Sequence, residues 1–160
     1  MTNETNRRAV LGVVLAAGAV ATTSLSAAAI SPAPKLSATD RRVLDLWARR
    51  AKLRLISRRT ADAFAAAKDA GNDAAELHRL LDRENDIVTT MIAVEDEIEK
   101  HIGTSLLALG AAILIEMRQG YQDIEADIYS ASLAVIRPQL TGAIAADADR
   151  VMAQDRKNRA

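Results

Sequence analysis

The sequence predicts an all-α protein built around a long antiparallel helical hairpin. The 160 residues include 7 glycines and 3 prolines, too few turn formers for a many-stranded sandwich or barrel. Ala, Leu, Arg, Asp and Glu dominate, which is a helical composition. Apolar side chains recur every three or four residues over long stretches, and no strand pattern of any strength appears. The length is that of one domain.

The first helix is expected over about 38–70. Ser37 stands three residues before Asp40, the spacing of an N-cap with an acidic residue at the third helical position. Gly71 suits the end of the helix, because glycine adopts a positive φ without a Cβ clash. One helix face repeats at alternating spacings of three and four: Val43, Leu46, Arg50, Leu53, Ser57, Thr60, Phe64 and Ala67.

The second helix is expected over about 73–102. Asp73 with Glu76 repeats the capping pattern, and Gly103 ends the helix. A heptad of Leu77, Leu80, Glu84, Ile87, Met91, Val94, Ile98 and His101 faces the first helix. The short connection between the two helices requires them to be antiparallel.

A third long helix is expected over about 104–136, capped by Thr104 or Ser105. The apolar run Ala111–Ile115 predicts the most buried stretch, with Gly110 and Gly120 as points of close packing. Pro138 breaks the pattern. A short fourth helix then completes a helical domain of residues 37–153, and residues 154–160 form a charged tail.

The first 29 residues predict an export signal. Arg7 and Arg8 precede thirteen uncharged residues, and Ala27 and Ala29 form a small-residue cleavage site. Arg7, Arg8 and Leu11 match the twin-arginine export motif, which would engage the export machinery. Residues 30–36 then form a short linker, and we expect a periplasmic or exported bacterial protein. The alternative is an uncleaved leader, with a cytoplasmic or N-terminally membrane-anchored protein.

Charge is distributed unevenly although the chain is neutral overall. Lys35–Ala70 holds ten basic and four acidic residues, whereas Asp73–Ser130 holds four basic and thirteen acidic residues. Complementarity between neighbouring helices is one interpretation. The alternative is an anion-binding face for a membrane surface or nucleic acid, formed by Arg50, Arg54 and Arg58 on one side of the first helix. Few aromatic residues accompany these arginines and the leader indicates export, so nucleic acid is not expected.

No motif for catalysis, cofactor binding or metal binding is found. The chain has no cysteine, which excludes zinc–thiolate sites and thiol nucleophiles. Neither His78 nor His101 has a glutamate three residues before it, as a di-iron bundle requires. Neither a Gly-x-Ser-x-Gly elbow nor a glycine-rich phosphate loop occurs. We therefore predict no catalytic, metal or cofactor residues and a protein that is not an enzyme.

The chain resembles a family of short helical alphaproteobacterial proteins, of rhizobial type, with a twin-arginine-like leader. The matching stretches are Asn6–Leu11 and Thr104–Leu109, and the layout of the whole chain is similar. Members of that family are uncharacterised, so the resemblance implies a helical fold and no site residues.

The function predicted from these features is helix–helix interaction by a non-enzymatic exported protein, with a second copy or another helical protein as its partner. A homo-oligomer would leave an uncovered apolar stripe after the hairpin closes, expected at Leu106, Leu109, Ile113 and Ile115. The alternative is an anion-binding module that uses the basic first helix.

Overall fold

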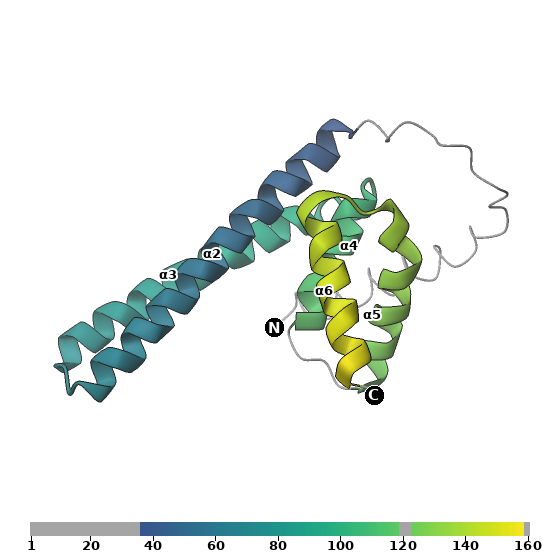
Figure 1. The fold of residues 1–160 in the computed structure, drawn as a ribbon. Helices are drawn as coiled ribbons and strands as arrows, with labels where there is room; N and C mark the ends of the chain where they lie inside the picture. The colour runs from purple at the N-terminus through teal and green to yellow at the C-terminus, as the bar shows by residue number, and fades with distance from the viewer. Residues whose placement is uncertain (1–35, 119–122, 159–160) are drawn as a thin grey trace, which may run out of the picture. The chain divides into compact units, whose positions relative to one another are not determined.

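The structure, a computed structural model, describes residues 36–118 and 123–158, with side chains for residues 36–117 and 128–158. The described residues from Ser37 onward belong to one compact unit, which contains helices and turns and, over these ranges, no strand (Figure 1). Its elements are α2 (Ala38–Asp69), α3 (Ala74–Glu99), α4 (Leu106–Arg118), α5 (Asp123–Ile136), the 3-10 turn η1 (Arg137–Gln139) and α6 (Gly142–Asn158). The predicted all-α class is confirmed. The export-signal residues Arg7, Arg8, Leu11, Ala27 and Ala29 lie outside the described residues.

The helical hairpin of α2 and α3 forms where the sequence predicts it, because its ends carry the predicted caps. The Ser37 hydroxyl accepts the Asp40 N–H at 3.0 Å, and the Asp40 carboxylate accepts the Ser37 N–H at 3.1 Å. The connection turns at Gly71, whose φ of +71° lies in the left-handed region. Asp73 then caps α3 by accepting the Glu76 N–H at 2.8 Å.

The hairpin seam contains polar as well as apolar side chains. Most of its buried residues come from the predicted 3–4 pattern, and two of them are the charged residues Arg50 and Glu95. The buried members are Val43, Leu46, Trp47, Arg50, Thr60 and Ala67 of α2 and Leu80, Ile87, Val94, Glu95 and Ile98 of α3.

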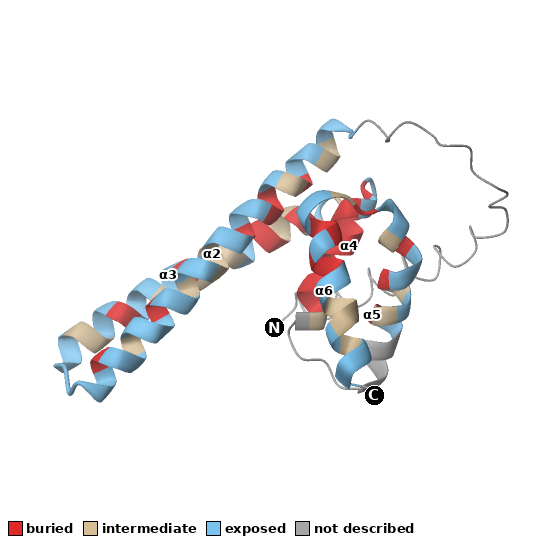
Figure 2. Ribbon diagram, viewed as in Figure 1, coloured by how far each residue is buried: buried red, intermediate tan, exposed pale blue. Residues whose placement is uncertain are grey.

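The helix predicted over 104–136 is divided into α4 and α5, which pack against each other and against α6. Every residue of Ala111–Ile115 is at most 2% exposed, so the run needs neighbours on all sides. The hairpin alone cannot supply them, whereas α5 and α6 complete the enclosure (Figures 1 and 2). The periodicity did not indicate this division, because the apolar spacing continues across it. Gly120 lies outside the described residues.

The packing of α4 also explains several local predictions. Ser105 is the residue that caps it, accepting the Ala108 N–H at 3.3 Å. Gly110 is a point of close packing, since a Cβ atom there would lie 2.6 Å from Leu140 Cδ2. Pro138 ends the preceding helix by forming η1. Helix α6 continues to Asn158, five residues past the predicted end of the helical domain.

The apolar stripe predicted to remain uncovered is mostly buried. Leu109, Ile113 and Ile115 are 7%, 0% and 1% exposed, and only Leu106, at 44%, faces solvent. The prediction of this stripe was wrong, because it assumed one continuous third helix instead of a helix enclosed by α5 and α6.

Among the helices of the described ranges, none has the combination of length and hydropathy that a membrane crossing needs.

Candidate functional site

A groove with a volume of about 500 Å³ lies between α2 and α6. This volume is in the usual range for small-ligand sites. Spacings of three and four residues bring six side chains of α2 to one side of that helix, and Asp147 and Arg150 share one face of α6. The lining consists of Trp47, Arg50, Ala51, Arg54, Leu55, Arg58, Asp147 and Arg150.

The floor of the groove is a buried polar contact between its two helices. Trp47 is 2% exposed and Asp147 is 7% exposed. The indole Nε1 of Trp47 donates a hydrogen bond of 2.9 Å to Oδ2 of Asp147. The other carboxylate oxygen of Asp147 accepts from Nη2 of Arg150. Asp147 therefore joins α6 to α2 and orients Arg150 at the rim.

Arg50 points inward and completes this floor. Its Nε donates to Oε1 of Glu95 on α3 at 2.6 Å, and both side chains are 6% exposed. Its guanidinium lies 5.1 Å from the centre of the Trp47 ring, within the range of a cation–π interaction. The charge of Arg50 is thus neutralised by a buried carboxylate behind the groove.

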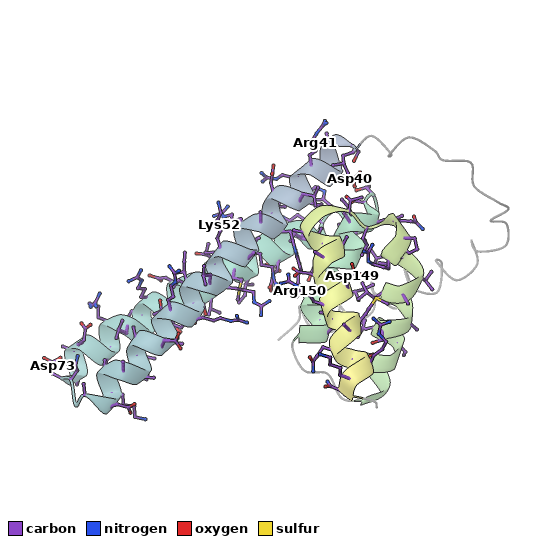
Figure 3. All side chains as sticks on the ribbon, viewed as in Figure 1. Asp40, Arg41, Lys52, Asp73, Asp149 and Arg150 are labelled. Carbon is purple, nitrogen blue, oxygen red and sulfur yellow. The ribbon has the colours of Figure 1, made fainter. Side chains whose placement is uncertain are left out.

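Three further arginines surround the opening. Arg54 is half-buried and Arg58 is exposed, and the side chain of Arg150 is 74% exposed. Figure 3 shows Arg150 on the side of α6 that faces the hairpin, whereas Lys52 lies on the far side of α2. Leu55, 51% exposed, adds an apolar wall. The lining comprises four arginines and one carboxylate, that of Asp147.

The structure brings together the three arginines that the sequence singled out but gives them different roles. Arg54 and Arg58 line the accessible part of the groove, while Arg50 is taken up by Glu95 and Trp47. The helical wheel placed Arg50 both on the apolar face and on the basic face, and the structure assigns it to the seam. The accessible part of the basic face therefore contains Arg54 and Arg58 without Arg50.

Sequence reasoning did not indicate Asp147 and Arg150 as site residues. One signal was available: Asp147 lies beside the apolar positions Ile144 and Ala148 of α6, where a carboxylate needs a buried partner. Nothing in the sequence pairs it with Trp47, one hundred residues earlier.

The histidines and acidic clusters give no second site. Within the described ranges, no group of three histidines or carboxylates is placed to hold a metal ion. Glu97, in the acidic run at the end of α3, pairs with Lys100 at 2.8 Å.

Comparisons with known proteins identify no relative: no family model matches the chain, and no curated protein or solved structure matches it significantly.

Proposed function

We propose that the helical domain is a non-enzymatic binding protein that holds an anionic group of its ligand in the groove between α2 and α6. The observation that supports this proposal is the convergence of Arg54, Arg58 and Arg150 on one concave surface. Guanidinium groups bind carboxylate and phosphate through paired N–H donors, which makes arginine the residue best suited to such groups.

The spacing of the arginines indicates how a ligand would be held. Arg54 and Arg58 are four residues apart, about 6 Å along the helix axis, so each can bind one oxygen group of an extended anion. Arg150 approaches from α6 and closes the other side. Leu55 and the Trp47 edge of the groove accommodate hydrocarbon next to the anionic group, so a purely inorganic anion would use only part of the site.

The lining also supports binding without catalysis. Asp147 is the one carboxylate among the lining residues, and Trp47 and Arg150 both donate to it. Both oxygens of this carboxylate are engaged by these donors, and the remaining lining side chains are arginine, alanine, leucine and tryptophan.

Adjacent arginines of α2 provide a matched test. Arg58 and Arg59 are both exposed and carry the same charge, but only Arg58 lines the groove. Titration calorimetry with citrate should show that Arg58→Ala weakens binding about fivefold or more. Arg59→Ala should bind like the wild type, because that residue lies outside the groove. An equal loss of citrate affinity in the two variants would mean that citrate responds to the overall positive charge of α2 and not to the groove, and the proposal would fail.

We propose further that the domain acts outside the cytoplasm, on the strength of the leader motif alone. Mass spectrometry of separated periplasm and cytoplasm should find a mature N-terminus near Ile30 in the periplasm. Replacing Arg7 and Arg8 by lysine should abolish this species. An intact leader on a cytoplasmic protein would contradict export.

A further inference from the structure

The surface beside the groove continues along the hairpin as an uncovered position for a third helix. Near its open end the hairpin is covered by α4, which contacts both α2 and α3. Towards the connection at Gly71, α2 and α3 continue as a two-helix arm that extends past α4, α5 and α6 (Figure 1). Within the part of the chain that the structure describes, no third helix covers this arm as α4 covers the other end of the hairpin.

One face of α3 in this arm carries an apolar stripe. Leu81 and Ile92 are each 45% exposed, and Val88 between them is half-buried. Their spacings of seven and four residues place them within about 40° of one another around the helix. Val88 and Ile92 lie one turn apart, whereas Glu84 and the exposed Asn85 occupy the turn between Leu81 and Val88.

Contacts across the seam place this stripe on the same side of the hairpin as the groove. Glu84, one turn from Leu81 and from Val88, accepts a hydrogen bond of 2.6 Å from Ser57. Glu95, one turn from Ile92, pairs with Arg50 on the groove floor. Both glutamates reach α2 along the edge of the seam next to the stripe, and that edge of α2 carries the groove arginines.

The facing part of α2 suits a helix rather than a small molecule. Arg54 and Arg58 are followed, at spacings of three and four, by the exposed small residues Ala61 and Ala65. In the seam below, Oε2 of Glu84 is buried without a hydrogen-bond partner among the described residues. The surface thus combines arginines on one edge with apolar side chains on the other.

We infer that the ligand is an amphipathic helix of another protein, whose apolar face packs on Leu81, Val88 and Ile92 and whose acidic flank faces Arg54 and Arg58. This inference rests on the proposed function, because the groove would hold a carboxylate of that flank. Charge complementarity favours an acidic helix as the partner, because a basic helix such as the α2 of a second copy would bring like charges together here.

A designed peptide of about 18 residues tests the inference with the full chain. Its helix has leucine on one face and glutamate on the flanks, and a second peptide has lysine in place of glutamate. Fluorescence anisotropy should show the glutamate peptide binding at least about tenfold more tightly than the lysine peptide. Equal affinity for the two peptides would overturn the inference.

Two variants locate the site. The double substitution Leu81→Gln and Ile92→Gln changes exposed positions, so the fold should be retained, and it should weaken the glutamate peptide about tenfold. Val135→Gln on α5, 57% exposed, is the control and should have no effect. Equal weakening by both would contradict docking on the arm.

Citrate separates this inference from the proposed function. Citrate binding that depends on Arg58, together with no peptide binding, would overturn the helix partner and leave the groove as an anion site. Loss of both would overturn both. Sedimentation that shows a dimer dissociated by Leu81→Gln would identify a second copy as the occupant and also overturn the inference.

Discussion

Nε of Arg50 on α2 lies 2.6 Å from Oε1 of Glu95 on α3, and each of these side chains is 6% exposed. The pair joins the two arms of the hairpin at the level where α6 also packs on α2. Because both charges are removed from water, each depends on the other for compensation. The pair therefore fixes the relative register of α2 and α3 more than it adds net stability.

Arg50→Ala should lower the free energy of unfolding by about 3–5 kcal/mol, since it leaves Glu95 buried and uncompensated. Replacing both residues by leucine should be much less destabilising, because no charge then remains in the seam. Urea denaturation of Arg50→Leu, Glu95→Leu and the double leucine variant provides the measurement. Additive losses in this cycle would show that the two charges do not depend on each other.

Trp47→Phe should destabilise the domain by about 1–3 kcal/mol, because Asp147 loses a buried hydrogen-bond donor while the aromatic packing is largely kept. Thermal unfolding followed by circular dichroism measures the change. In an Asp147→Ala background the same substitution should have a smaller effect, because the acceptor has already been removed. An equal effect in both backgrounds would attribute the loss to packing alone.

Gly110→Ala should destabilise the domain by about 1–3 kcal/mol despite the higher helix propensity of alanine, because the new Cβ would lie 2.6 Å from Leu140 Cδ2. In a Leu140→Ala background the clash disappears, and the same substitution should become stabilising by up to about 1 kcal/mol. Chemical denaturation of the four proteins tests the change of sign. A loss that persists in the Leu140→Ala background would mean that Gly110 is needed for another reason.

Asp40 should make stability depend on acidity. The hydroxyl of Ser105 donates to it at 2.7 Å, and this hydrogen bond, followed by those from Ser37, lowers the pKa of the Asp40 carboxyl below its ordinary value. A lowered folded-state pKa adds stability that is complete above the unfolded value of about 3.9 and is lost as the pH falls through the folded value. Asp40→Asn should therefore be less stable than the wild type at neutral pH.

That difference should shrink as the pH falls below about 4, because the wild-type carboxyl then becomes protonated. Urea midpoints between neutral and acidic pH measure the trend. Ser105→Ala, which removes the strongest hydrogen bond to Asp40, should show the same trend with a smaller amplitude. A difference that is independent of pH would contradict the role of the carboxylate.

The hairpin was predictable because residues close together in the sequence determine where its helices begin, end and pack. Ser37 with Asp40, Gly71 and Asp73 determine the ends of α2 and α3 through contacts within four residues, and the 3–4 spacing determines the seam. The division between α4 and α5 was not predictable in the same way. The apolar spacing continues across it, so only the need to enclose Ala111–Ile115 on every side distinguishes two helices from one.

The groove was predictable only on its α2 side. The positions of Arg54 and Arg58 follow from the helical wheel. Arg50 fits both the apolar face and the basic face of that wheel, and only its contact with Glu95 assigns it to the hairpin seam. Asp147 and Arg150 come from a helix whose position relative to α2 is a tertiary property. Periodicity describes a face of one helix and contains no information about which distant helix lies opposite it.

The separation of Trp47 and Asp147 along the chain has a consequence for the order of folding. Contacts within the hairpin close short loops, whereas the contact between α2 and α6 joins residues one hundred positions apart. Closing a loop of that length costs more conformational entropy than closing the short loop of the hairpin. We therefore expect the hairpin to form first and α6 to dock late. Since α6 forms one wall of the groove, a nascent or partly folded chain would have its long helices but an incomplete groove.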